Sequence, residues 1–149
     1  MLVIRPGHVS NKISVQKALL EWQAANPETA ALCDPARYNG LTVEVKQVSK
    51  QTFLEALAMC RSTGGLDSEI EIYRAMGMLV QHAIKQVHGL EDLDGKVLLE
   101  ADESGSLTDE SLELLHDNDL VMDLWRIARM YNELSAEEKK TFSEQAQPI

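Results

Sequence analysis

The chain has little of what marks disulfide-bonded or zinc-binding proteins. Only two of its 149 residues are cysteines, Cys33 and Cys60, with no CxxC spacing and no histidine at a metal-ligand spacing beside either. Isolated thiols of this kind are typical of buried or incidental cysteines rather than of a disulfide or a zinc site. The sequence therefore predicts a protein of a reducing, cytoplasmic compartment that folds without disulfides or bound metal.

Long hydrophobic runs are also missing. The apolar run that precedes Arg5 and Pro6 is only four residues long, shorter than the core of a signal peptide. No later run approaches the roughly 20 apolar residues that a helix needs to cross a bilayer. We therefore expect no signal peptide and no membrane partner.

Basic side chains are scarce and acidic ones are concentrated. The chain has 14 Lys and Arg against 24 Asp and Glu, a net charge of −10, and the stretch 91–119 alone holds eleven acids and one base, which is also −10. Nucleic acid requires clustered positive charge, so direct binding of DNA or RNA is not expected. Charge confined to one stretch favours a surface that docks a protein partner over an active site.

Motifs that would carry catalysis are absent. The sequence contains no GxSxG, GxxxxGK[ST], GxGxxG or HExxH, and its four histidines include no i, i+4 pair. We therefore predict no catalytic residues, no cofactor and no enzymatic activity. A calcium loop of the EF-hand type would need glycine at its sixth position, where Val97 follows a start at Asp92 and Leu107 follows a start at Asp102. A solvated or partner-facing acidic surface is the favoured interpretation.

Hydrophobic periodicity predicts an α+β fold that is predominantly helical, with four to six helices and one small antiparallel hairpin or sheet. Helices are expected over 14–26, 49–60, 67–88, 108–116, 117–134 and 135–147, with one or two further helical turns over 28–32. Ser49 and Thr108 are the expected caps of two of these helices. Alternation predicts a strand over 41–46, and Asp94-Gly95 predicts a hairpin over 93–99 that would supply its partner strand.

We expect one domain over residues 1–149. Its parts are an irregular arm (1–13), a helical N-terminal extension (14–40) and a core (41–146). The boundaries follow the turn residues at either end of the extension.

The helix expected over 117–134 is apolar on more than one side. Leu120, Leu124 and Ile127 belong to its main stripe, which further apolar residues widen. A helix that is apolar on two sides buries one against its own core and offers the other to a partner. The partner-binding residues predicted on this basis are Val121, Met122, Trp125 and Ala128, together with Asp102 and Glu103 as an acidic rim.

The order of these elements resembles a known family. The segments concerned are Val43-Glu-Val-Lys-Gln-Val, Ser49-Lys-Gln-Thr-Phe-Leu-Glu-Ala-Leu, Leu93-Asp-Gly-Lys, Leu107-Thr-Asp-Glu-Ser-Leu-Glu-Leu-Leu and Tyr131-Asn-Glu-Leu-Ser-Ala-Glu-Glu-Lys-Lys. Together they are similar, over about residues 41–142, to the tail assembly chaperones of long-tailed bacteriophages. Residues 1–40 have no counterpart in that pattern, and 100–106 is a longer acidic insertion than the pattern contains.

The resemblance implies a small non-catalytic protein of the host cytoplasm. In phage or prophage tail assembly it would bind the tape measure protein and the tail tube protein, shield their apolar helices and be absent from the finished particle. A second copy of the chain, as a homo-oligomer, is another candidate partner. An acidic regulatory or calcium-responsive binding module and a structural virion component are the alternative functions.

Overall fold

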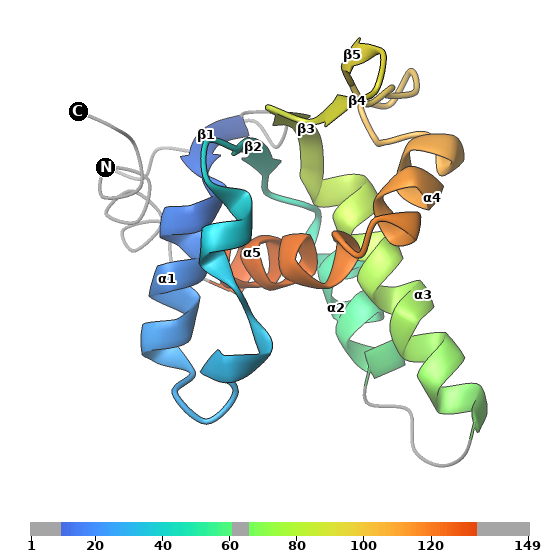
Figure 1. Ribbon diagram of the computed structural model, residues 1–149. Helices are drawn as coiled ribbons and strands as arrows, with labels where there is room; N and C mark the ends of the chain where they lie inside the picture. The colour runs from blue at the N-terminus through green and yellow to red at the C-terminus, as the bar shows by residue number, and fades with distance from the viewer. Residues whose placement is uncertain (1–9, 61–65, 134–149) are drawn as a thin grey trace, which may run out of the picture.

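The computed structural model describes residues 10–60 and 66–133, which form a small antiparallel sheet packed on a set of helices (Figure 1). The N-terminal elements are β1 (Ser10–Ser14), α1 (Val15–Ala25), the 3₁₀ helices η1 (Ala30–Leu32) and η2 (Pro35–Tyr38), and β2 (Thr42–Lys46). They are followed by α2 (Lys50–Cys60), α3 (Leu66–Ala83), β3 (Ile84–His88), β4 (Glu91–Asp92), β5 (Gly95–Lys96), α4 (Asp109–Asp117) and α5 (Val121–Glu133). The predicted fold class, α+β and mostly helical, is confirmed. None of the helices in these ranges is long and apolar enough to cross a membrane.

The sheet has the strand order β1-β2-β3, and both pairings are antiparallel. The strand predicted over 41–46 is confirmed as β2, whose Val43 and Val45 are buried while Thr42, Glu44 and Lys46 are not. Its predicted partner is wrong, because β4 and β5 pair with each other in a separate hairpin. The turn of this hairpin is Leu93-Asp94, one residue before the predicted Asp94-Gly95. The strands that pair with β2 come instead from the expected irregular arm, which supplies β1, and from the segment after α3. Residues 1–9 lie outside the described ranges.

The long helix predicted over 67–88 ends early, at Ala83, and its last five residues form β3. The spacing of Ile84 and Val87 suits a helix, since residues three apart share a helical face but lie on opposite faces of a regular strand. A bulge resolves the conflict: Ile84 pairs with Val45 and Gln86 with Glu44, which leaves Lys85 as an extra residue. Both apolar side chains therefore reach the core, and pairing with β2 overrides the helical pattern.

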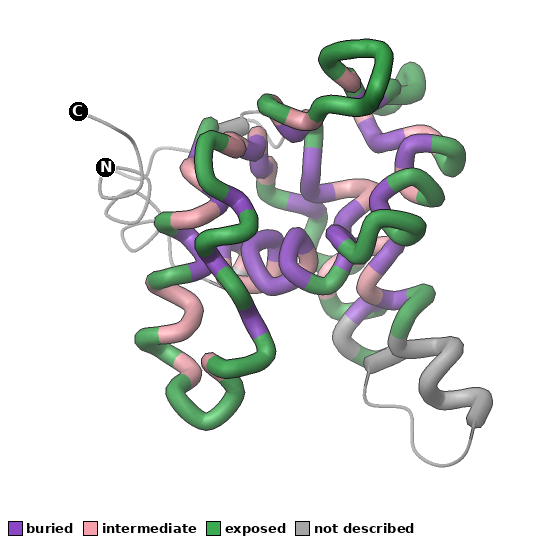
Figure 2. The backbone as a smooth tube through the Cα atoms, viewed as in Figure 1, coloured by how far each residue is buried: buried purple, intermediate pink, exposed green. Residues whose placement is uncertain are grey.

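The core is continuous from β1 to α5. Buried side chains of the predicted N-terminal extension, including Val15, Leu19 and Tyr38, belong to the same cluster as Val43, Leu79 and Ile127. Figure 2 shows the buried residues concentrated along α5 and on the inner sides of the elements around it. The extension is therefore part of the core and not an addition to it.

The predicted helix caps are confirmed, and one helix boundary is corrected. The Ser49 hydroxyl accepts a hydrogen bond from the Thr52 amide at 3.2 Å, and the Thr108 hydroxyl accepts one from the Ser111 amide at 3.2 Å. α5 begins at Val121 and not at 117, because Asp119 has a positive φ of 57° that breaks the helical path. The helix predicted over 135–147 lies outside the described residues.

Candidate functional site

The structure buries two of the predicted partner-binding residues of α5. Val121 is 4% exposed and Ala128 is fully buried, so the expectation that they form an outward apolar face is wrong. They pack in the core because α5 has neighbours on several sides, namely α1, α3 and β2. Trp125 is half-buried and Met122 is 38% exposed. Met122 is thus the member of the predicted set on α5 that is most accessible.

The predicted acidic rim is exposed but does not join α5. The Asp102 carboxylate accepts hydrogen bonds from the Ser104 hydroxyl at 2.6 Å, the Ser104 amide at 2.9 Å and the Ser106 amide at 3.1 Å. These bonds lower the pKa of Asp102 and show that its carboxylate organises its own loop. The loop is attached to α3, where the His82 ring contacts the Ser106 hydroxyl at 2.8 Å. Glu103 is exposed beside it.

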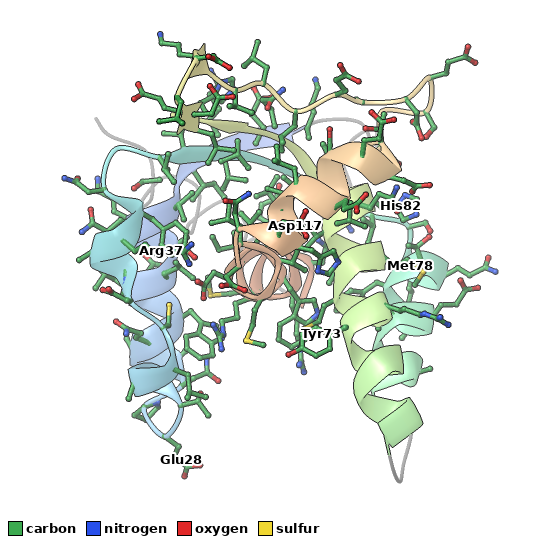
Figure 3. The ribbon with its side chains drawn as sticks, turned by 45° about the vertical axis from the view of Figure 1, so that its right-hand side comes forward. Glu28, Arg37, Tyr73, Met78, His82 and Asp117 are labelled. Carbon is green, nitrogen blue, oxygen red and sulfur yellow. The ribbon has the colours of Figure 1, made fainter. Side chains whose placement is uncertain are left out.

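A groove beside the N-terminal half of α5 is a candidate site. In Figure 1, α5 crosses between α1 with η1 and η2 on one side and α2 with α3 on the other. The hollow between them measures about 270 Å³ and is lined by Leu32, Arg37, Tyr73, Met76, His116, Asp119, Val121, Met122, Asp123 and Arg126. Figure 3 shows Arg37 and Tyr73 on opposite sides of it. We call this hollow the groove.

The walls of the groove carry unusually exposed apolar side chains. Leu32 is 72% exposed, Tyr73 is 54% exposed and Met122 is 38% exposed, although all three are large. They come from η1, α3 and α5, which are far apart in the sequence. Single exposed apolar residues are ordinary, whereas several around one hollow are typical of a binding surface.

A buried polar cluster closes one side of the groove. The Tyr38 hydroxyl donates a hydrogen bond to the Asp123 carboxylate, and Arg126 pairs with the same carboxylate at 2.5 Å. The Arg126 guanidinium also lies over the Trp22 ring, 4.7 Å from its centroid. The Cys33 thiol lies close enough to Asp123 for this carboxylate to raise the pKa of the thiol. Asp123 therefore connects α5 to η2, and Arg126 connects it to α1.

Arg37 joins the same region to the end of α4. Its guanidinium donates hydrogen bonds to the carbonyl oxygens of Asn118 at 2.7 Å and Asp119 at 3.2 Å. These carbonyls follow the last turn of α4, where unpaired acceptors and the negative end of the helix dipole favour a cation. Arg37 thus holds the turn between α4 and α5 against η2, and its guanidinium donates these hydrogen bonds within the protein.

The buried cluster predicts a loss of stability at alkaline pH. Burial, and then the nearby Asp123 carboxylate, raise the pKa of the Cys33 thiol to about 11, and the same two causes raise the pKa of Tyr38 above its usual range. Both groups keep their protons to higher pH in the folded state, so the unfolded state releases protons first. The free energy of unfolding should therefore fall as pH rises above about 9.

Urea denaturation between pH 8 and 10.5, followed by circular dichroism, measures this effect. In Cys33→Ala the free energy of unfolding should depend less on pH in the lower part of this range. Of Cys33 and Tyr38, only the cysteine thiol titrates there in the unfolded state. An unchanged slope in Cys33→Ala would show that the Cys33 thiol does not contribute.

Sequence reasoning missed the groove residues Leu32, Arg37 and Tyr73. No local pattern marks them, because each lies on a different element and only the packing of α1, α3 and α5 brings them together. One signal was present: Asp123 and Arg126 are opposite charges at i, i+3 spacing among the apolar residues of the first two turns of α5, which is typical of a charge pair on one side of a helix. Over 10–60 and 66–133 no group of three or more His, Cys, Asp or Glu is placed to hold a metal ion.

Comparison with known proteins leaves this geometry as the main guide to function. No protein-family model, no curated protein and no solved structure matches the chain.

Proposed function

We propose that this protein is a non-catalytic tail assembly chaperone of a long-tailed phage or prophage, acting in the host cytoplasm. Its partners would be helical segments of the tape measure protein and of the tail tube protein. The resemblance of residues 41–142 to the chaperone family supports the biological setting. The observation that carries the proposal is the groove, where Leu32, Tyr73 and Met122 surround one hollow.

The size of the groove suits the side chains of a partner better than a free small molecule. Pockets for small ligands usually measure about 300 to 1,000 Å³ and enclose most of the ligand. The groove measures about 270 Å³, and its walls leave large parts of Leu32 and Tyr73 in solvent. An amphipathic helix laid across such a hollow inserts one or two apolar anchors and covers the exposed walls. Burial of these walls would supply affinity at about 25 cal/mol per Å² of apolar surface.

Mutation of the groove walls tests the proposal. Leu32→Ala and Tyr73→Ala should each weaken binding of a tape measure fragment by about 1 to 2 kcal/mol, or roughly 5- to 30-fold in Kd, as expected for apolar contacts at the centre of an interface. Fluorescence anisotropy of a labelled fragment gives the Kd, and thermal melting checks that each variant is folded.

Leu54→Ala is the matched control, because Leu54 is 51% exposed on α2 and does not line the groove. It should leave the Kd within about twofold of the wild-type value. Equal weakening by all three variants, or by none, would rule out the groove as the binding site. Stable incorporation of the protein into purified particles would instead identify a structural virion component. A calcium-dependent rise in Tm would favour the calcium-responsive alternative.

A further inference from the structure

The exposed surface of α4 next to the groove is rich in acidic side chains. The helix has the sequence Asp-Glu-Ser-Leu-Glu-Leu-Leu-His-Asp and contains no lysine or arginine. Asp109, Glu113 and Asp117 are spaced i, i+4, so they lie on one face of the helix, and all three are exposed. We call these three residues the α4 stripe. The C-terminal end of the α4 stripe meets the groove, since His116 and Asp119 line the groove on either side of Asp117 in the sequence.

Local stability accounts for Asp109, which stands in the first turn of α4 and accepts a hydrogen bond from the Gln81 side-chain amide at 2.9 Å, but not for Glu113 and Asp117. Like charges four residues apart repel one another on a helix, and Asp117 stands at the C-terminal end of α4, where the helix dipole disfavours an anion. Within the described part of the chain, no hydrogen bond or ion pair reaches the carboxylates of Glu113, Asp117 or Asp119. These carboxylates therefore face solvent unpaired, next to a hollow with both apolar and charged walls.

The cations of the groove are committed to the protein itself. Arg126 is paired with Asp123 at 2.5 Å, and Arg37 donates to the carbonyls of Asn118 and Asp119. Arg126 is neutralised by Asp123, whereas Arg37 keeps its positive charge beside Asp119 because carbonyl oxygens do not neutralise a guanidinium. The unpaired negative charges that a partner meets along α4 are therefore those of Asp117 and Glu113. Figure 3 shows Asp117 at the lower end of α4, above Tyr73 and on the same side of Arg37 as Tyr73 is. A partner that approaches this side meets apolar walls and unpaired negative charge.

We infer that the groove takes a basic amphipathic helix, whose apolar side contacts Leu32, Tyr73 and Met122 and whose lysines or arginines lie along the α4 stripe. This inference rests on the proposed function and names the chemistry of its partner. Residues four apart on a helix are separated by about 6 Å along the axis. A partner helix with bases at i, i+4 would therefore match the spacing of the stripe when it lies beside α4. Leu114, 41% exposed on the same helix, would extend the apolar contact.

Three synthetic peptides of about 20 residues test the inference with the full chain. They share one apolar face of leucine and methionine and carry lysine, glutamine or glutamate at i, i+4 positions beside it. The lysine peptide should bind at least about tenfold more tightly than the glutamate peptide at 150 mM salt, with the glutamine peptide between them. Equal binding of the lysine and glutamate peptides would overturn the inference.

Variants of the stripe locate the effect. Glu113→Gln combined with Asp117→Asn should weaken the lysine peptide about tenfold and reduce the salt dependence of its Kd, while the glutamine peptide is unaffected. The matched control is Glu91→Gln with Glu100→Gln, which removes the same charge from exposed positions outside α4. At 150 mM salt the Debye length is about 8 Å, so this control should change the Kd by less than about twofold.

The possible failures are distinguishable. Equal weakening by the stripe variant and its control would show a non-specific effect of net charge and overturn the stripe. If Leu32→Ala weakens the lysine peptide but the stripe variant does not, the groove binds a helix without selecting its charge, and only the further inference fails. If neither has an effect, the groove is not the site and the proposed function fails with it.

Discussion

Replacement of Asp123 by alanine is expected to lower the free energy of unfolding by about 3 to 5 kcal/mol. Asp123 is 8% exposed and Arg126 is 6% exposed, and Asp123 accepts hydrogen bonds from both Arg126 and the Tyr38 hydroxyl. Alanine would leave a buried guanidinium without its counter-ion and a buried hydroxyl without its acceptor. Loss of one member of such a group costs more than loss of the whole group, because the remaining polar atoms stay desolvated.

Urea denaturation followed by circular dichroism measures the change. Glu113→Ala, at an exposed position without a partner in the described structure, should stay within about 0.5 kcal/mol of the wild type. Replacement of the pair together, as Asp123→Leu with Arg126→Met, should recover much of the loss because no unpaired charge remains. A loss below about 1 kcal/mol for Asp123→Ala would show that the buried cluster contributes little to stability.

Substitution of Gly89 by alanine is expected to lower the free energy of unfolding by about 3 kcal/mol. Gly89 follows β3 with a φ of +101°, and a Cβ there would lie 2.7 Å from Leu41 Cδ2 and 3.1 Å from the Gly40 carbonyl oxygen. Alanine therefore adds a strained backbone conformation to a steric contact with a backbone atom that has little freedom to move.

Gly40→Ala separates the two effects. Gly40 has a φ of +82°, but a Cβ at this position has no atom within 4 Å. Its substitution should cost only the conformational part, about 1 to 2 kcal/mol, in the same urea experiment. Equal losses for the two variants would mean that Leu41 and the turn move aside, so that the contact adds nothing at Gly89.

Local chemistry explains which predictions from the sequence were confirmed. Ser49 and Thr108 cap helices because each hydroxyl reaches a free amide three residues along its own chain. A hairpin forms near the predicted place, with its turn at Leu93-Asp94, and Gly95 begins β5 with a φ of +129° that glycine accepts. All eleven acids of 91–119 are exposed, as expected for charges without buried partners. These outcomes depend on interactions within a few residues.

Residue periodicity was ambiguous where distant segments meet. The spacing of Ile84 and Val87 predicted a helix, and only the bulge opposite β2 makes the same spacing fit a strand. β1 was hidden because Ser10–Ser14 has few apolar residues of its own and is held by its pairing with β2. The outward face predicted for Val121 and Ala128 was wrong for a related reason, since the number of neighbours around α5 cannot be counted from its own pattern.

The sequence by itself determined the fold class, the helix caps, the acidic surface and the absence of known catalytic motifs, because each depends on composition or on short-range contacts. Only the tertiary structure decided the sheet order, the end of α3 and the groove. Leu32, Tyr73 and Met122 are separated by dozens of residues, and they surround one hollow because the packing of α1, α3 and α5 places them there. A site assembled from such distant positions leaves no periodic signal along the chain, since its spacing exists only in three dimensions.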